Sequence, residues 1–356
     1  MADWKIQKVS ISKLEIFFQE KMLLSQSVLP ISPSRVKSYC NNPRAKSDDV
    51  SLYFIEFENR IIAFRTVWAD EIQLDEELVR FGWCSGNWVA DDFRRRGLST
   101  LILQEMYSDW NGKLMFTNYA PESLAGYLKT GLFTLQCERT GMRFYLNTNL
   151  AKLYANRANS GLKKAAVWLA NKTFFSSYLI KRMIFKSQPM DHFKIDEQRQ
   201  FSAGYSFVGK ASLFNRGEKE FAWIFNCPWL VKDDGVPSSY PFSWKVKDFE
   251  YCFVSINSQH AECSFVISIK NGTVKLLYWH ATVEHHELIA KWLVNFSHRN
   301  KVKLLTVLDD QMAGAIKRIR NPFVWSRTFS MNIYSTFSFE DNKNKVFDGD
   351  GDYIFT

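Results

Sequence analysis

The sequence predicts a mixed α/β protein built from two tandem domains with a shared order of elements. Three observations lead to this prediction. The chain has 356 residues, which is long for one domain and comfortable for two. Helical and strand patterns alternate over residues 1–148, and a similar order returns over residues 193–356. Between them, residues 149–192 form a basic, helix-prone stretch, which predicts a helical linker.

The pattern of the first half predicts two helices, then a β-hairpin, and then strands that alternate with helices. Ser12 can cap the first helix, and Ser32-Pro33-Ser34 starts the second. Aromatic and β-branched residues flank Glu58-Asn59-Arg60, as expected of a hairpin. The predicted elements are helix 9–28, a short helix from 32, strands 50–57, 61–68 and 81–89, helix 98–110, strand 114–117, a helical stretch ending at Gly131, and a closing strand 142–146.

The second half repeats much of this order. Asn271-Gly272 is a strong signal for a two-residue hairpin turn. The predicted elements are strands 251–256, 265–269 and 274–280, helix 283–298, strand 303–308, helix 311–320, and strands within 323–335. We therefore expect a second domain with the same architecture as the first.

The segment between the two halves has an unusual charge pattern. Its basic residues are Lys152, Arg157, Lys163, Lys164, Lys172, Lys181, Arg182 and Lys186, and residues 151–186 contain no Asp or Glu. Apolar residues recur along the same stretch at helical spacing, so the segment is amphipathic. One interpretation is a bridging helix that packs its apolar face on a domain. The alternative is a helix in peripheral contact with an anionic membrane surface.

Composition narrows the class of protein. The net charge of +9 is concentrated in this one segment, so the sequence lacks the broad basic footprint of a nucleic-acid-binding protein. The six cysteines form no C-x-x-C pair, which argues against a zinc site or a disulfide framework. We see no signal peptide and no stretch of eighteen apolar residues, and we expect a cytoplasmic protein.

The stretch Val89–Thr100 has the pattern of an anion-binding site. An apolar, β-prone run leads into Arg94-Arg95-Arg96-Gly97, and a helix-like run starts at Leu98. A strand that turns into a helix directs free backbone N–H groups and the positive end of the helix dipole at one point. Glycine lets a ligand approach the backbone closely, and the arginines add positive charge. The pattern therefore favours a phosphate-bearing ligand.

Two motifs in the correct order resemble the signatures of the GCN5-related N-acetyltransferases, the GNAT superfamily. Arg94-x-x-Gly97-x-Ser99 is similar to the pyrophosphate loop of that family. The run Asn118…Ser123…Tyr127-x-Lys129-x-Gly131-Leu132-Phe133 is similar to its later motif. The corresponding junction in the second half, residues 278–286, contains no glycine and no arginine. The second domain therefore resembles a degenerate GNAT-like copy that does not bind the cofactor.

This resemblance implies an acyl donor and roles for individual residues. The donor is acetyl-coenzyme A, and no metal takes part. Its pyrophosphate is expected on the arginine loop and its pantetheine arm along the strand ending at Val89, where a backbone N–H takes the carbonyl. Tyr127 corresponds to the tyrosine that can protonate the departing thiolate. The implied cofactor contacts are Trp88, Val89, Arg94, Arg95, Arg96, Gly97, Leu98, Ser99, Thr100 and Asn118.

Several other side chains have more than one possible role. Arg35, Lys37 and Tyr39 are either substrate contacts or surface residues of a helix. No histidine precedes His192, so the base for the first domain is not identified; Glu71, Asp75, Glu76 and Glu77 are the acidic residues before the central strand. Cys84 and Cys137 fit core packing better than acyl transfer. Asp348-Gly349-Asp350-Gly351-Asp352 reads as an acidic, turn-rich tail that could fold back on residues 151–186.

The sequence as a whole predicts an acetyl-coenzyme-A-dependent N-acyltransferase that acts on a small-molecule amine. An amino sugar or nucleotide-linked amino sugar of surface-polysaccharide synthesis is the expected acceptor, by analogy within the family. Two alternatives stay open. One is an aminoacyl-transferring relative of the peptidoglycan-bridge ligases. The other is a non-catalytic GNAT-fold binding protein at the membrane surface. The sequence does not indicate an oligomeric state.

Overall fold

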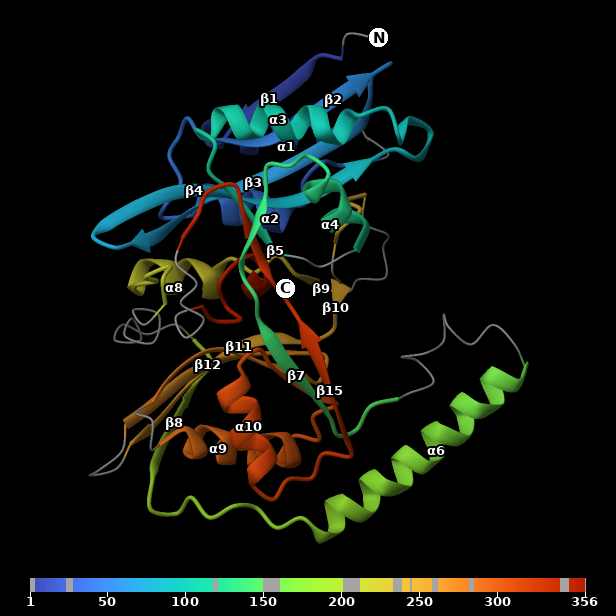
Figure 1. Ribbon diagram of the computed structural model, residues 1–356, viewed down its shortest axis with the longest axis vertical. Helices are drawn as coiled ribbons and strands as arrows, with labels where there is room; N and C mark the ends of the chain where they lie inside the picture. The colour runs from blue at the N-terminus through green and yellow to red at the C-terminus, as the bar shows by residue number, and fades with distance from the viewer. Residues whose placement is uncertain are drawn as a thin grey trace. The chain divides into compact units, whose positions relative to one another are not determined.

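A computed structural model of the chain forms two compact units, and both units are discontinuous in sequence. The structure describes residues 4–23, 28–117, 121–149, 161–200, 212–232, 239–243, 245–257, 262–281, 285–339 and 346–355. Unit 1 comprises residues 1–139, 200–247 and 331–356. Unit 2 comprises residues 140–199 and 248–330. Figure 1 shows the elements of both units.

Unit 1 is built on a sheet of seven described strands in the order β1-β2-β3-β4-β5-β16-β6. The strands are β1 (Ile6–Ser10), β2 (Val50–Phe57), β3 (Arg60–Leu74), β4 (Glu77–Val89), β5 (Leu114–Thr117), β16 (Ile333–Ser335) and β6 (Thr134–Cys137). The helices are α1 (Ile11–Leu23), α2 (Pro33–Cys40), α3 (Leu98–Asp109), α4 (Pro121–Leu128) and α8 (Glu218–Asn226). Two 3₁₀ turns, η1 (Asp91–Phe93) and η5 (Asp352–Phe355), and the strand pair β9 (Val231–Lys232) and β10 (Lys245–Val246) complete the described part.

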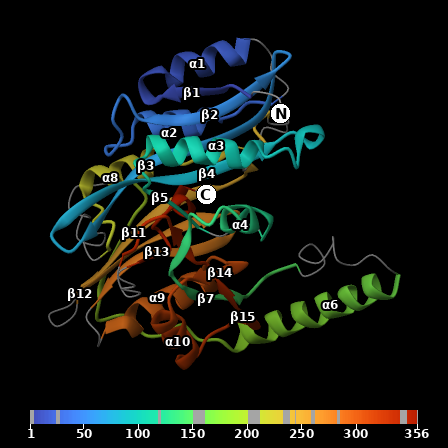
Figure 2. The same cartoon turned by 45° about the horizontal axis from the view of Figure 1, so that its top comes forward.

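The helices of unit 1 cover both faces of this sheet. Strand residues alternate between faces, so neighbours in β2 meet different helices. Tyr53 and Ile55 belong to the buried cluster that contains the apolar side of α3. Phe54 points the other way and packs on Phe17 of α1, with ring centroids 5.1 Å apart. Figure 2 shows α1 and α3 on the two sides of the strands.

Unit 2 has a second sheet of seven described strands, in the order β15-β7-β14-β13-β12-β11-β8. The strands are β15 (Trp325–Ser330), β7 (Thr140–Tyr145), β14 (Leu304–Val307), β13 (Thr273–Ala281), β12 (Glu262–Lys270), β11 (Phe249–Asn257) and β8 (Lys194–Gln198). The helices are α6 (Gly161–Ile184), α9 (His286–Arg299) and α10 (Asp310–Arg318). The mixed α/β class and the repeated element order are thus confirmed.

The two halves of the chain exchange one strand each, which the sequence analysis did not anticipate. The strand expected at 142–146 to close the first unit is β7, and it pairs with β14 and β15 in the sheet of unit 2. In return, β16 comes from the last part of the chain and pairs with β5 and β6 in the sheet of unit 1. The expected closure is therefore wrong. The compact units do not follow the linear division into 1–148, 149–192 and 193–356.

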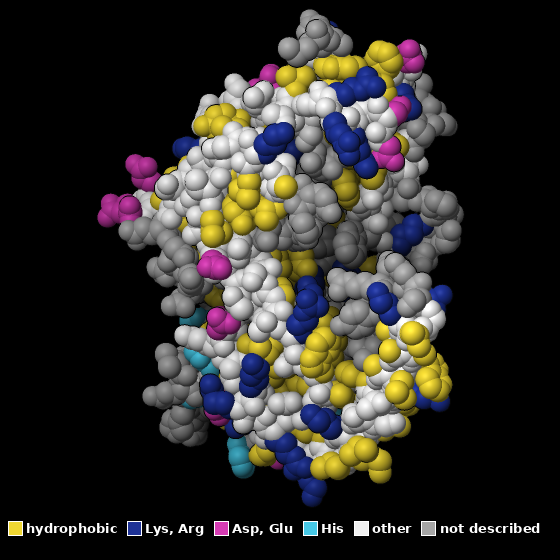
Figure 3. Space-filling model, turned by 45° about the vertical axis from the view of Figure 1, so that its right-hand side comes forward, with side chains coloured by type: hydrophobic (Ala, Val, Ile, Leu, Met, Phe, Trp, Pro, Cys, Tyr) yellow, Lys and Arg dark blue, Asp and Glu magenta, His cyan; other side chains and the backbone are white. Residues whose placement is uncertain are grey.

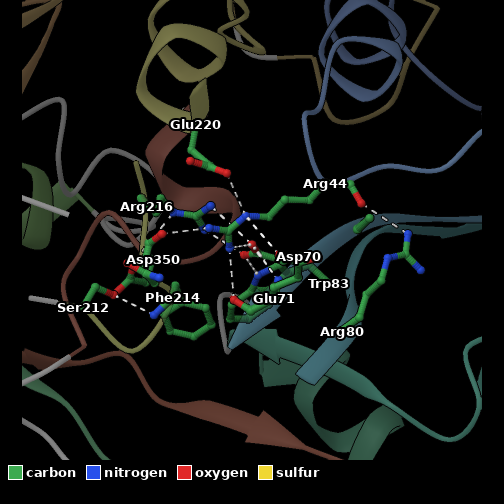
Figure 4. A network of polar contacts seen from close by, with 12 residues as sticks. Arg44, Asp70, Glu71, Arg80, Trp83, Ser212, Phe214, Arg216, Glu220 and Asp350 are labelled. Atoms are coloured by element: carbon green, nitrogen blue, oxygen red, sulfur yellow. Dashed lines mark hydrogen bonds and ion pairs between the residues drawn. The ribbon is translucent and has the colours of Figure 1, made fainter. Parts of the chain in front are cut away.

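The acidic tail and the stretch beginning at Arg216 belong to the interior of unit 1. Asp70 on β3 is fully buried, and Arg216 donates to both of its carboxylate oxygens, at 2.7 and 3.3 Å. Arg44 donates to Asp70 at 2.8 Å, and the Trp83 indole does so at 2.7 Å. Asp350 accepts from Ser212 at 2.8 Å and lies 3.8 Å from Arg216 (Figure 4). This pairing of Asp350 replaces the expectation that the tail folds back on residues 151–186.

The basic segment forms the predicted helix over its described part, as α6. Phe174 and Tyr178 are buried, and Tyr178 joins the core of unit 2. Arg320 donates to the carbonyl of Ile184 at 2.8 Å, and Lys181 donates to the carbonyl of Phe323. In the part of the chain that the structure describes, no helix has the length and apolar character needed to cross a membrane.

Candidate functional site

The central feature of unit 1 is the point at which β4 and β5 separate. These parallel strands pair only at Gly82↔Leu114 and Trp83↔Met115. Strand β4 continues to Val89, and beyond Trp83 its edge toward β5 has no partner strand among the described residues. A strand edge without a partner presents backbone N–H and C=O groups to a ligand. The separation therefore offers a place for an extended, amide-bearing molecule.

A β-bulge at Gly86 marks the same position. Thr66 pairs with Ser85 and Arg65 pairs with Asn87, so Gly86 is the extra residue on β4. Its φ is +59°, a left-handed conformation that favours glycine. A Cβ at Gly86 would lie 2.8 Å from Oγ1 of Thr66 and 2.9 Å from the hydroxyl of Tyr240. Only glycine fits here without displacement, and the bulge changes which face the next side chains reach.

The predicted anion site follows directly after β4. Gly97 has φ +81° and caps α3, and a Cβ built on it meets nothing within 4 Å. Space beside this backbone is therefore open to a ligand. Arg95 also has a positive φ, +64°, so the turn runs through two left-handed residues. The first turn of a helix has N–H groups that lack an intrahelical acceptor. The loop thus has the local geometry of a phosphate cradle.

The three arginines of the loop are not equivalent. Arg94 is 62% exposed and pairs with Asp91 at 2.7 Å. Arg96 donates to the carbonyl of Asp92 at 3.1 Å and lies over the ring of Phe93. These contacts are at the surface, where such pairs are weak and easily exchanged for a ligand anion. The arginines can therefore supply charge to a bound phosphate without a large cost in protein stability.

A buried arginine that the sequence analysis missed fixes the start of α3. Arg65 on β3 donates through Nε to the carbonyl of Ser99 at 3.0 Å and through Nη2 to the Ser99 hydroxyl at 2.8 Å. The Ser99 hydroxyl lies 3.1 Å from the side-chain oxygen of Asn87 on β4. Ser99 therefore links the helix to both central strands. The sequence feature that could have revealed this residue is a charged side chain, Arg65, within a run of β-branched residues.

Tyr127 lies beneath this junction and is buried. Its ring stacks on Phe116 with centroids 4.0 Å apart, and the Arg65 guanidinium lies 4.7 Å from the ring centroid. Burial raises the pKa of Tyr127 above its ordinary value, although the Arg65 charge opposes the shift. The phenol therefore remains protonated at neutral pH. It faces Cys84 of β4, with which it shares the α3 side of the sheet.

The opposite face of β4 carries a polar cluster. Arg35 on α2 is buried and donates to the hydroxyl of Ser85 at 2.7 Å. That hydroxyl donates to Asp352 at 3.1 Å, and Thr117 at the end of β5 donates to the other carboxylate oxygen at 3.2 Å. Asp352 is thus held between the two strands at the point where they separate. From the sequence, Asp352 was expected only as part of an acidic tail.

Aromatic residues enclose this cluster. The Arg35 guanidinium lies 4.0 Å from the ring centroid of Trp229 and 5.4 Å from that of Tyr240. The Tyr39 hydroxyl donates to Thr66 at 3.3 Å. Arg35 and Tyr39 therefore line the Ser85 face, whereas Lys37 is directed to the carbonyl of Asn226 at the surface. Of the three open residues on α2, Arg35 bonds to β4 and Tyr39 bonds to the neighbouring strand β3.

The remaining predicted residues fall in three groups. Trp88 stacks on Phe64 of β3 at 5.6 Å, and Leu98 is buried beneath α3. Val89 ends β4 and Thr100 lies in the first turn of α3, so both flank the loop. Asn118 lies outside the described residues. No ligand contact of any of these residues is tested by the structure, and their assignment stays a prediction.

Three of the four acidic candidates, Asp75, Glu76 and Glu77, do not reach this site, and Glu71 lies on β3, 3.9 Å from Arg44. Asp75 and Glu76 form the turn between β3 and β4, and Glu77 begins β4. Eight residues of strand separate Glu77 from Ser85, about 26 Å at the usual rise per residue. Cys84 is buried, and burial raises the pKa of its thiol to about 12. Cys84 and Cys137 are both core residues, as expected.

The adjacent histidines His285 and His286 gather no metal-binding cluster in the described part of the chain. His285 caps α9 and His286 begins it, and the ring of His286 packs edge-on against Trp279. Among the described residues, no group of three or more His, Cys, Asp or Glu side chains is placed to hold a metal ion.

Comparisons with known proteins identify the fold. No protein-family profile matches the chain, and no curated protein matches it in sequence. A protein from Enterococcus faecalis named a probable N-acyltransferase matches with TM-score 0.53 at 8% identity, over 93% of this chain and 72% of that chain. A GCN5-related N-acetyltransferase from Anabaena variabilis matches with TM-score 0.50 at 8% identity, over the same shares, 93% and 72%.

A third match extends over nearly the whole chain. Saccharomyces cerevisiae N-myristoyltransferase, solved with bound myristoyl-CoA, matches with TM-score 0.50 at 9% identity, over 98% of this chain and 83% of that chain. The chain therefore has the GNAT fold in two tandem copies, as the sequence predicted. At these identities the likeness establishes architecture, and the chemistry has to be argued from the site itself.

Proposed function

We propose that this protein is a coenzyme-A-dependent N-acyltransferase, which moves an acyl group from a thioester to an amine. The observation that carries the proposal is the separation of β4 from β5 immediately before the open, Gly97-capped start of α3. An acyl-coenzyme A has two matching parts, an extended arm with two amides and a pyrophosphate. The free strand edge suits the arm, and the loop suits the pyrophosphate.

The two faces of β4 suit opposite ends of the reaction. On the Ser85 face, Asp352 is a carboxylate that can take the one proton that a neutral attacking amine gives up as it forms the amide bond. On the Cys84 face, Tyr127 is a protonated phenol that can donate to the departing thiolate. The amine nitrogen bonds to the acyl carbon, the carbon–sulfur bond breaks, and coenzyme A leaves as the thiol. One proton leaves the nitrogen and one reaches the sulfur, so the step balances.

We also propose specific identities for the acyl donor and the amine acceptor. We take acetyl-coenzyme A as the donor to test first, because the loop motif resembles that of acetyltransferases. The yeast structure contains myristoyl-CoA, so a long-chain thioester is the necessary second donor. For the acceptor we propose a primary amine, with amino sugars and their nucleotide conjugates as the first class to screen. This choice rests on the family resemblance.

Calorimetric titration with acetyl-coenzyme A and with myristoyl-coenzyme A tests the proposed donor site. We expect binding that weakens at least about tenfold in Gly97→Ala, because a Cβ would occupy the space beside the phosphate-facing backbone. Gly131→Ala is the matched control, since Gly131 also has positive φ, +71°, and open space around its Cβ position. Both variants should be equally strained, and only the first should lose affinity.

Absence of heat with both thioesters, at concentrations up to millimolar, would contradict the proposal. Binding without turnover of any amine would instead indicate a non-catalytic acyl-coenzyme-A-binding protein. Mass spectrometry of acyl transfer to a panel of amines separates these two outcomes. The same panel, with aminoacyl-tRNA added as a donor, tests the aminoacyl-transfer alternative.

A further inference from the structure

Helix α6 presents a broad apolar face that the core of unit 2 does not use. Eight large apolar side chains on it are strongly exposed: Leu162 88%, Met183 86%, Leu169 60%, Ile184 59%, Trp168 57%, Ile180 57%, Phe175 51% and Leu179 42%. Figure 3 shows hydrophobic side chains gathered with basic ones over this helix, at the lower right. Soluble proteins rarely leave a contiguous apolar surface of this kind uncovered. The outward face of α6 therefore requires an occupant.

The side chains of α6 divide by their position around the helix. Phe174 and Tyr178, four residues apart, lie on one stripe and are buried. At about 100° per residue, Leu162, Leu169 and Ile180 fall on the opposite side. The inner stripe, with the Arg320 bond to the Ile184 carbonyl, holds the helix on unit 2. These contacts consequently fix the orientation of the apolar outward face, whether or not a partner is bound.

Basic side chains border this face on both sides. Lys164 and Arg182 share one flank and Lys163 and Lys181 the other, because each pair is eighteen residues apart, a whole number of turns. The second flank lies beside the inner stripe, and Lys181 there donates to the carbonyl of Phe323. Lys172 lies toward the outer face itself, with its ammonium 3.9 Å from the ring centroid of Trp168. Residues Gly161–Ile184 contain no acidic residue. A long lysine can lay its methylenes on apolar surface and place its charge at a polar boundary.

We propose that α6 docks on an anionic phospholipid surface, with its outward apolar face at the acyl-chain boundary and its basic flanks on the headgroup phosphates. The charge pattern selects this occupant over a second copy of the chain. Two α6 helices brought face to face would oppose their basic flanks with no acidic side chain in either helix to compensate. An anionic lipid surface complements both the flanks and the apolar face at once.

Vesicle flotation of the full-length chain tests this proposal without reference to any enzymatic activity. We expect the wild type to float with vesicles of phosphatidylcholine mixed with phosphatidylglycerol, and much less with phosphatidylcholine alone. Lys164→Gln/Lys172→Gln should weaken partitioning about 25-fold, at about fivefold per basic residue near an anionic surface. Leu169→Gln/Ile180→Gln should weaken it at least about tenfold, since both side chains would leave the apolar boundary.

The control removes the same charge elsewhere. Lys5→Gln/Lys13→Gln changes two exposed lysines of unit 1 and should leave partitioning within about twofold of the wild type. Far-UV circular dichroism should be unchanged in all variants, since glutamine is a good helix former at exposed positions. Failure of the wild type to float with anionic vesicles overturns the proposal, as does an equal loss in the control. A dimer that dissociates in Leu169→Gln/Ile180→Gln, with no flotation, would show that a second copy occupies the face.

Discussion

Arg216 donates to both carboxylate oxygens of Asp70, at 2.7 and 3.3 Å, although 146 residues separate them in the chain. Both side chains are fully buried. Asp70 lies on β3 of the sheet of unit 1, and Arg216 lies directly before Gly217, the N-cap of α8. Together with Arg44 and Asp350 they connect three separate segments of the sequence into unit 1. The pair thus has a structural role. Asp70 pairs with Phe81 in the middle of the β3–β4 ladder, between the Gly86 bulge and the β3–β4 turn.

Replacement of Arg216 should destabilise unit 1 strongly. Arg216→Met removes the guanidinium and leaves Asp70 buried with part of its compensation lost, which costs about 3–5 kcal/mol of unfolding free energy. Denaturant unfolding followed by tryptophan fluorescence measures this. Lys219→Met is the matched control, because Lys219 is exposed on α8, and its effect should stay within about 0.5 kcal/mol. A loss below about 1 kcal/mol in Arg216→Met would contradict the structural role.

The same network predicts loss of stability in acid. Burial alone would raise the pKa of Asp70, but the charges of Arg216 and Arg44 outweigh it, so the pKa is lowered. The pKa of Glu220 is lowered in the same way: burial alone would raise it, but the charge of Arg44 outweighs burial. A carboxyl group whose pKa is lower in the folded protein stabilises the fold at pH values above its pKa in the unfolded chain, about 4. This stabilisation is lost as the pH falls through the pKa of the group in the folded protein.

Unfolding free energies measured at intervals from pH 7 to pH 3 check this prediction. Stability should change little near neutrality on account of these groups and fall steeply below about pH 4. In Arg216→Met the fall should be shallower, because the pKa of Asp70 is then less depressed. Parallel curves for the two proteins would mean that other groups govern the acid transition.

The bulge on β4 should tolerate glycine alone. Gly86→Ala forces a non-glycine residue to φ +59° and brings its Cβ within 3.0 Å of Thr66 and Tyr240. We expect a loss of about 2 kcal/mol in unfolding free energy and a loss of acyl-coenzyme A binding. Gly126→Ala, in helix α4 with open space around the Cβ position, is the control and should be neutral or slightly stabilising. Equal behaviour of the two variants would count against a specific role for the bulge.

Asp352 should be required for transfer and not for donor binding. Asp352→Asn keeps the shape of the side chain and removes the proton acceptor, so kcat should fall about 100-fold while the Kd of acyl-coenzyme A stays unchanged. Tyr127→Phe should also lower kcat. A kcat for Asp352→Asn within about threefold of the wild type would exclude Asp352 as the base.

Short stretches of the sequence are enough to predict much of the candidate site. The alternation of helix and strand patterns, the Gly97 turn and the start of α3 depend on residues close in the chain, and all were predicted. Arg65, Gly86 and Asp352 were not recognised, for different reasons. Gly86 gave a local signal, because glycine within a strand indicates a bulge. Arg65 stands out locally as an arginine within a β-branched run, but its partner Ser99 lies far along the chain. The partners of Asp352, Ser85 and Thr117, are also distant in sequence, so local patterns do not identify these contacts.

The sequence alone determined the element order, the mixed α/β class and the place of the Gly97 turn before α3, because periodicity, caps and turns are set by neighbouring residues. Only the tertiary structure decided that β7 and β16 join sheets other than those of their sequence neighbours. It also decided that Asp352 lies between Ser85 and Thr117. A strand's own pattern specifies which face is buried, but its partner is chosen by the free energy of the whole packed unit, which no short stretch of sequence contains.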